Sequence, residues 1–255
     1  MNRCTTLEIP IDSIESARRA VVAADRLEVC SDLDTEGWTP DPELLREVVG
    51  LADGHQVEVV ALIRPRHRSG SGGAGIEDFL VTTEVMAASL DAVESAADAG
   101  ANTVAIGPLR SDGRVDREAC ERLVRHASQR GLRVSFLRSI DLVPDREEAI
   151  GTLFELGVVR ILTAGVTGWD ATAVTLEERA ARCRRDVLFA GSLADATERE
   201  PIEVMIGGGV RSSNVTAFTA CSPHVHSSCR EDGRFDLDEL ERMRRALDRM
   251  GSSGG

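Results

Sequence analysis

Eight short apolar runs alternate with longer amphipathic stretches along the chain, and this alternation constrains the fold more than any other feature. The runs are rich in β-branched residues, which is typical of strands buried on both faces of a parallel sheet. They occupy residues 7–11, 27–30, 57–63, 103–107, 132–137, 158–163, 202–207 and 224–227. The pattern predicts a repeating unit of one strand and one helix.

Capping signals mark the intervening helices. Residues with N-cap side chains precede the amphipathic stretches at Ser13, Asp41, Asp116 and Asp145. Glycines stand where three of the helices should end, at Gly100, Gly131 and Gly157. The alternation predicts a single (β/α)8 barrel over residues 1–250, followed by a flexible tail at 251–255. The alternative is a doubly wound open sheet, which would show a GxGxxG turn after the first strand, where this chain reads IPIDSIES.

Composition excludes several classes of protein. A formal net charge of −13 argues against binding to nucleic acid, which requires a surplus of positive groups on some face. The thirty basic residues are all arginines, so Schiff-base enzymes, pyridoxal phosphate enzymes and Walker phosphate loops, which need a lysine, are excluded. The chain also has no tyrosine, which removes the phenol as an acid or base.

The sequence carries no signal for a membrane span or for secretion. Its six cysteines are scattered without a CxxC pair, which favours reduced thiols over disulfides. We therefore expect a cytoplasmic protein with no membrane partner.

Charged residues occur near the carboxyl ends of the predicted strands, where a barrel of this class carries its active site. They are two arginines and three carboxylates: Arg64, Arg138, Glu8, Glu28 and Asp141. Two guanidiniums facing one pocket favour a carboxylate or phosphate ligand, and the carboxylates can act as general acid or base or hold a divalent cation. The same residues can also pair with one another as buried charges, and the sequence leaves both readings open.

Two short motifs lie at the carboxyl ends of the last two predicted strands: MIGGGV at residues 205–210 and HSS at residues 226–228. In many barrels a phosphate binds between the loops that follow strands seven and eight. Gly208 and Gly209 would let backbone N–H groups approach an oxyanion, and Ser227 or Ser228 would add a hydroxyl donor. The alternative is that the glycines only release the chain from strand seven.

A set of motifs from Leu7 to about Ser228 carries a family resemblance: LEIPIDSIESA, DRLEVCSDLDTEGWTPDPELLREV, ALIRPR, VAIGPLRSDGRVD, GVVRILTAG, MIGGGVRSSNV and VHSS. In this order they resemble the CutC family, named for copper homeostasis. The resemblance implies a cytoplasmic (β/α)8 barrel, often a homodimer, that handles copper. The chain departs from the family at Leu137, where a histidine is usual, and in an insertion at residues 186–200.

Copper chemistry points to Cys30 and His226. Cu(I) prefers thiolate and imidazole ligands, and only strand one would separate the strands that carry these two residues. Because side chains alternate along a strand, Cys30 should face the barrel interior if Glu28 does. The alternative is a cysteine that packs as a small hydrophobe.

Three functions remain open. The first is a CutC-like role in copper homeostasis through Cu(I) binding. The second is a barrel enzyme, or a binder, for a small anionic or phosphorylated metabolite. The third is a noncatalytic homodimer with an interaction role.

Overall fold

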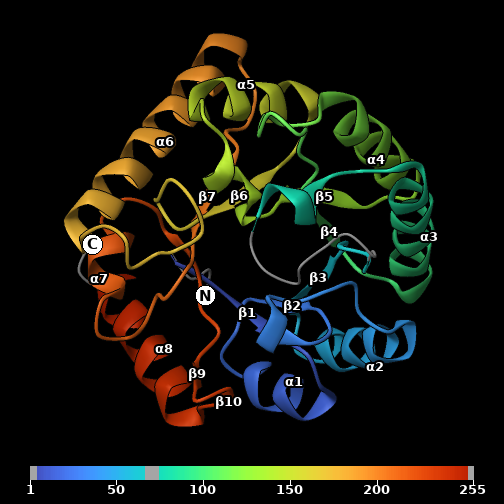
Figure 1. The fold of residues 1–255 in the computed structure, drawn as a ribbon. Helices are drawn as coiled ribbons and strands as arrows, with labels where there is room; N and C mark the ends of the chain where they lie inside the picture. Colours follow the sequence, from blue (N-terminus) through green and yellow to red (C-terminus); the bar gives the residue numbers. More distant parts are fainter. Residues whose placement is uncertain (1–4, 67–74, 252–255) are drawn as a thin grey trace.

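Eight parallel strands close into a barrel in the order in which they occur in the sequence (Figure 1). The structure is a computed structural model that describes residues 5–66 and 75–251. The barrel strands are β1 (Thr6–Ile11), β2 (Arg26–Val29), β3 (Glu58–Leu62), β4 (Thr103–Ile106), β5 (Arg133–Phe136), β6 (Arg160–Thr163), β7 (Glu203–Ile206) and β8 (His224–His226). Each overlaps one of the predicted apolar runs. The predicted (β/α)8 barrel is confirmed, and the sheet is not open.

The barrel closes between its first and last strands. β1 pairs with β8 so that Glu8 lies opposite His226, and it pairs with β2 so that Pro10 lies opposite Glu28. Glu28 is therefore displaced by two residues along the barrel from the level of Glu8. This closure sets the first strand of the chain beside the last strand of the barrel.

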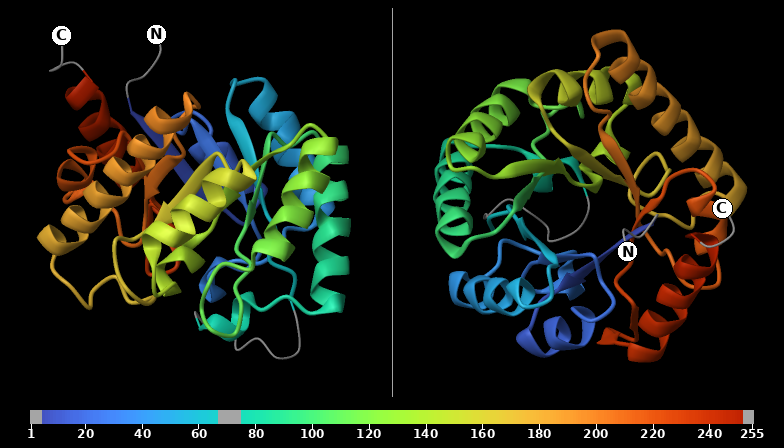
Figure 2. Two further views of the ribbon diagram at one scale, coloured as in Figure 1. Left: turned by 90° about the horizontal axis from the view of Figure 1, so that it is seen from above. Right: turned by 180° about the vertical axis from the view of Figure 1, so that it is seen from behind.

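The helices form the outer layer around the strands (Figure 2). They are α1 (Ile14–Ala20), α2 (Pro42–Asp53), α3 (Thr83–Ala99), α4 (Arg117–Gln129), α5 (Arg146–Leu156), α6 (Leu176–Thr197), α7 (Val215–Thr219) and α8 (Leu237–Gly251). The four predicted N-caps are confirmed, since Ser13, Asp41, Asp116 and Asp145 each accept a hydrogen bond from a backbone N–H in the first turn.

Short elements occupy the loops at the carboxyl ends of the strands. They are the 3-10 turns η1 (Leu33–Thr35), η2 (Ile76–Phe79) and η3 (Arg138–Leu142), and the hairpin of β9 (Arg230–Glu231) and β10 (Arg234–Phe235). Most of the insertion at residues 186–200 is helical, because α6 continues without a break to Thr197.

The core fills the barrel and the space beneath the helices. Apolar side chains from the strands and from the inner faces of the helices make one continuous buried cluster. None of the described helices combines the length and the apolar character that crossing a membrane would need. Helix α8 extends one residue into the predicted tail, and residues 252–255 lie outside the described part of the chain.

Candidate active site at the barrel mouth

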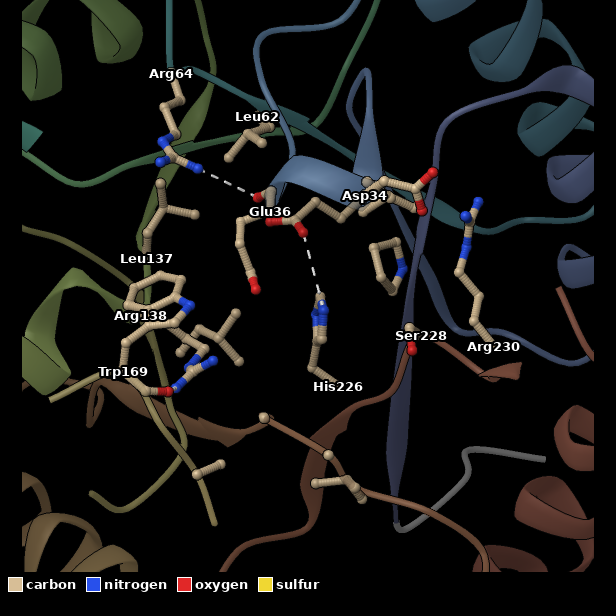
Figure 3. Close-up of a pocket in the computed structure, with 18 of the residues that line it drawn as sticks. Asp34, Glu36, Leu62, Arg64, Leu137, Arg138, Trp169, His226, Ser228 and Arg230 are labelled. Carbon is tan, nitrogen blue, oxygen red and sulfur yellow. Dashed lines mark hydrogen bonds and ion pairs between the residues drawn. The ribbon is translucent and has the colours of Figure 1, made fainter. Parts of the chain in front are cut away.

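A cavity of about 630 Å³ opens at the carboxyl ends of the barrel strands. Figure 3 shows His226 near its centre, with Arg138 and Trp169 on one side and Ser228 and Arg230 on the other. The sequence-predicted residues that line it are Glu28, Arg64, Arg138, Gly208, Gly209, His226 and Ser228. The other predicted residues do not line it: Glu8, Cys30, Asp141 and Ser227.

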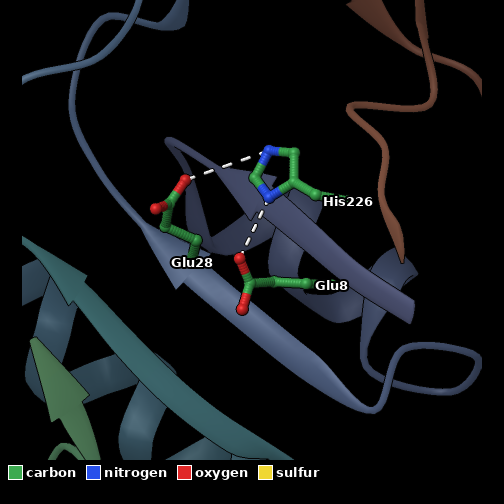
Figure 4. Close-up of side chains that lie close together, drawn as sticks. All are labelled: Glu8, Glu28 and His226. Atoms are coloured by element: carbon green, nitrogen blue, oxygen red, sulfur yellow. Dashed lines mark hydrogen bonds and ion pairs between the residues drawn. The ribbon is translucent and has the colours of Figure 1, made fainter. Parts of the chain in front are cut away.

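Glu8, His226 and Glu28 lie close together, and His226 and Glu28 line this cavity (Figure 4). The register of β1 and β8 places Glu8 Oε1 3.0 Å from His226 Nδ1. The other ring nitrogen, Nε2, lies 4.0 Å from Glu28 Oε2. The imidazole therefore has a carboxylate at each nitrogen, and the hydrogen bond to Glu8 fixes its orientation.

Burial and neighbouring charges shift the titration of all three groups. Burial alone would raise the pKa of the Glu8 carboxyl, but the hydrogen bond with His226 and the charges of His226, Arg160 and Arg26 hold it below its usual value. Burial raises the pKa of Glu28 to about 7 despite the opposing charge of His226. Burial would lower the pKa of His226, yet the hydrogen bond with Glu8 and the charge of Glu28 raise it. A carboxyl that titrates near neutral pH and a histidine whose pKa is raised thus lie together at the cavity.

A layer of paired charges lies at the opposite ends of the strands. Arg160, which is 1% exposed, donates from Nε to Glu203 at 2.6 Å, and its Nη1 lies 3.5 Å from Glu58 and 3.9 Å from Glu8. Arg26 donates to both carboxylate oxygens of Glu203, at 3.0 and 2.9 Å. This layer was not predicted from the sequence. A signal was available, because Arg26, Glu58, Arg160 and Glu203 are the first residues of β2, β3, β6 and β7.

Arg64 reaches the cavity from the end of β3. Its guanidinium stacks on the rings of Trp38 and Phe79, 4.4 and 5.0 Å from their centroids, and donates to the carbonyl oxygen of Gly37 at 3.1 Å. Burial lowers the pKa of this guanidinium, against the charges of Asp78 and Glu36. The aromatic contacts hold the charge at the wall of the cavity.

Arg138 and Asp141 belong to η3, and their roles differ. Asp141 is fully buried and accepts hydrogen bonds from Thr163 Oγ1 at 2.6 Å, the Ala164 N–H at 2.9 Å and Arg138 Nε at 3.1 Å. Arg138 also donates to the carbonyl oxygen of Trp169 and stacks on its ring. Asp141 therefore fixes Arg138, and only Arg138 lines the cavity.

The predicted anion-binding residues lie on neighbouring loops, but not all of them line the cavity. Gly208 and Gly209 adopt left-handed conformations, with φ of +68° and +75°, and line the cavity with Ser228. A Cβ on Gly208 would lie 2.5 Å from Ala164 Cβ, so this position is closely packed. Ser227 is buried, and its hydroxyl donates to the carbonyl oxygen of Val210 at 2.7 Å. Ser227 therefore ties the two loops together.

Cys30 lies apart from His226. Its thiol is buried and donates to the carbonyl oxygen of Ile11 at 3.4 Å. Burial, with the charges of Glu28 and Asp12, raises the pKa of this thiol well above its usual value. Among the described residues, Glu8, Glu28 and His226 have ligand atoms within 4.8 Å of one another, in a cluster that does not include Cys30. These oxygen and nitrogen donors suit a divalent cation better than Cu(I).

Leu137 occupies the position where the resemblance would place a histidine. It is 8% exposed and forms part of the apolar wall of the cavity with Leu62 and Leu162. This wall therefore lacks a titratable group at residue 137.

The part of the chain that matches known proteins contains all eight barrel strands. The model of the CutC family matches residues 5–231. A protein of Sinorhizobium medicae, named as a family protein CutC, is 36% identical over 90% of this chain and 82% of its own length. The human protein named copper homeostasis protein cutC homolog is 32% identical over 97% of this chain and 80% of its own length.

Solved structures extend the likeness to the fold. The crystal structure of a CutC protein from Streptococcus agalactiae superposes with a TM-score of 0.73 at 23% identity, covering 88% of this chain and 98% of that one. A deoxyribose phosphate aldolase from Aeropyrum pernix superposes with a TM-score of 0.60 at 17% identity over 92% and 88% of the two chains, so the aldolase shares the fold alone. From its sequence and its relatives, this chain belongs to the CutC family.

Proposed function

We propose that this CutC-family protein binds a small anionic molecule in the cavity at the barrel mouth and transfers protons to and from it. One observation carries the proposal: His226, held at Nδ1 by Glu8, presents Nε2 beside Glu28 at a cavity whose walls carry Arg64 and Arg138. A cavity of about 630 Å³ is of the size that small-molecule sites have.

Glu28 and His226 have complementary roles in this proposal. Glu8 and Glu28 favour the protonated imidazole, whose Nε2–H can donate a proton toward the cavity. Glu28, with a pKa of about 7, is ionised in a large fraction of molecules at neutral pH and can accept a proton. An acid and a base on one side of a bound molecule suit the removal and return of a proton, as in an isomerisation.

The arginines supply the charge that would select an anion. Arg64 and Arg138 are each fixed by stacking on an aromatic ring and by hydrogen bonds to carbonyl oxygens. A guanidinium that is already ordered loses little freedom when a ligand binds. Negative charge developing on the ligand during proton removal would be stabilised by the same groups.

The test has a binding step and a chemical step. Thermal shift measurements with a panel of organic acids and phosphosugars should give stabilisation that Arg138→Gln reduces, because the variant removes a charge from the cavity wall. Each ligand that binds is then incubated in D2O, and NMR follows exchange of its C–H protons. We expect Glu28→Gln and His226→Asn to stop the exchange while binding persists. The proposal is wrong if no ligand binds, or if exchange survives in both variants.

A second function rests on the relatives. The human relative is named a copper homeostasis protein, and we propose a role in copper homeostasis for this chain too. Cu(I) would be cargo, and His226 offers an imidazole nitrogen at the cavity. The donor set does not fit a shared Cys30–His226 site, because the Cys30 thiol is engaged with Ile11 and is costly to ionise. Anaerobic titration of the protein with Cu(I), in competition with a Cu(I) chelator, tests this role. If Cys30→Ala weakens Cu(I) binding, Cys30 is a ligand after all. If the protein does not bind Cu(I), the proposed copper role is wrong.

We also propose that the protein is a cytoplasmic homodimer, as the family resemblance implies. Sedimentation equilibrium at micromolar concentration tests the dimer. A monomeric mass would contradict it and would also remove the third function considered above, a noncatalytic dimer.

A further inference from the structure

The loops that follow β7 and β8 both line the cavity, and they carry several hydrogen-bond donors without a protein acceptor in the described part of the chain. Gly208, Gly209, Val210 and Ser228 all line it. Within the described residues, the backbone N–H groups of these four and the hydroxyl of Ser228 donate to no protein acceptor. Of the four residues only Val210 is buried, and a buried backbone N–H is nearly always paired, so these donors are available to a partner from outside the chain.

Arg211 adds a positive charge to these donors. Arg211 lines the cavity, and its backbone N–H donates to Asn214 Oδ1 at 2.8 Å, a hydrogen bond that orders the loop. No carboxylate of the described chain lies within 4.0 Å of its guanidinium. Arg138 and Arg230, which line the same cavity, are paired with Asp141 and Asp12. Of the two arginines on these loops, Arg211 and Arg230, only Arg230 therefore has a carboxylate partner among the described residues.

We propose that these two loops bind the phosphate group of a phosphate monoester, with Arg211 as its charged partner. The inference rests on the proposed binding of a small anion and names the chemical class of that anion. A carboxylate has two oxygens, whereas a phosphate monoester has three terminal oxygens and carries close to two negative charges at neutral pH. Four backbone N–H groups, one hydroxyl and a guanidinium offer more donors than a carboxylate can accept. The donor count therefore selects the phosphate.

The position of the site limits the length of the ligand. Ser228 follows His226 by two residues, which in an extended chain corresponds to roughly 6.6 Å. If the phosphate group of a ligand lies at Ser228, an atom of the same ligand a few bonds from the phosphorus would thus lie beside His226 Nε2 and Glu28. The ligand class that satisfies both ends is a short organophosphate with an exchangeable proton close to its phosphate.

Isothermal titration calorimetry at constant ionic strength tests the inference, with inorganic phosphate and glycerol 3-phosphate as phosphate probes and malonate as a carboxylate probe. Arg211→Gln should weaken phosphate binding by about tenfold or more, because it removes a charge-assisted hydrogen bond. Ser228→Ala should weaken it less. The matched control is Arg245→Gln on α8, an exposed arginine whose side chain contacts Glu241, and it should leave the affinity unchanged.

The outcomes separate this inference from the proposed function. Phosphate affinity that Arg211→Gln leaves unchanged would overturn the inference, as would malonate binding that depends on Arg211 to the same degree. Malonate binding that depends on Arg138 alone, without phosphate binding, would overturn it while supporting the proposed anion site. If phosphate binds through Arg211 but the proton exchange does not depend on Glu28 or His226, the phosphate site stands and the proposed proton transfer is wrong.

Discussion

Replacing Glu28 with glutamine should make the folded protein more stable at neutral and alkaline pH. Glu28 is 7% exposed, and burial raises its pKa to about 7 from a usual value of 4.5. Between these two pH values the folded protein keeps a proton on Glu28 that the unfolded chain has already released. Stability therefore falls as pH rises through this window, because proton release favours the unfolded state. Glutamine has a similar shape and cannot ionise, so the variant avoids this loss.

The magnitude follows from the pKa shift. At about 1.36 kcal/mol per pKa unit, ionising Glu28 in the folded protein costs about 3 kcal/mol relative to the unfolded chain. About 1.5 kcal/mol of this should develop between roughly pH 5.5 and 7, a range in which unfolding can be measured above the isoelectric point near 4.9. A smaller part develops between pH 7 and about pH 8, above which the difference between variant and parent should become constant.

Urea denaturation of the parent and Glu28→Gln at half-unit intervals from pH 5.5 to 8.5 measures the difference in the free energy of unfolding. Taking the difference cancels the titration of groups shared by both proteins. Glu121→Gln, which removes an exposed carboxylate from the outer helix α4, controls for the change in net charge. A stability difference for Glu28→Gln that stays flat across this range would refute the reasoning, because it would mean that burial does not raise the pKa of Glu28.

Three further predictions follow from the packing around the site. Glu8→Gln should lower stability by about 2 kcal/mol, since a charge-assisted hydrogen bond between the buried Glu8 and the half-buried His226 is weakened, and urea denaturation at pH 7 measures the loss. Gly208→Ala should lower the melting temperature more than Gly209→Ala: both residues have positive φ, but an added Cβ would crowd another side chain only at Gly208, and equal losses would contradict this. Cys30 should react with iodoacetamide more slowly than the half-buried Cys221, since its thiol is buried and its pKa is raised well above the usual value. Mass spectrometry of the native protein after short exposures would show the order of labelling.

Local patterns in the sequence determined the architecture. Apolar β-branched runs, N-cap side chains and helix-ending glycines depend on residues close together in the chain, and each predicts one strand or one helix boundary. Ser13 and Asp116 cap helices as predicted because capping involves only the next three residues. Once eight such units follow one another, the closed barrel is the arrangement that buries all their strands.

The tertiary structure decided the chemistry of the site. Glu8 and His226 are 218 residues apart, and the register with which β1 meets β8 sets them opposite each other. The sequence placed Glu28 and Asp141 equally among the candidates, but the loop after β5 turns Asp141 inward to hold Arg138, while Glu28 faces the cavity. Burial, hydrogen bonding and charge pairing depend on which distant residues come into contact. They are therefore properties of the closed barrel, whereas the order of its strands and helices is already present in the sequence.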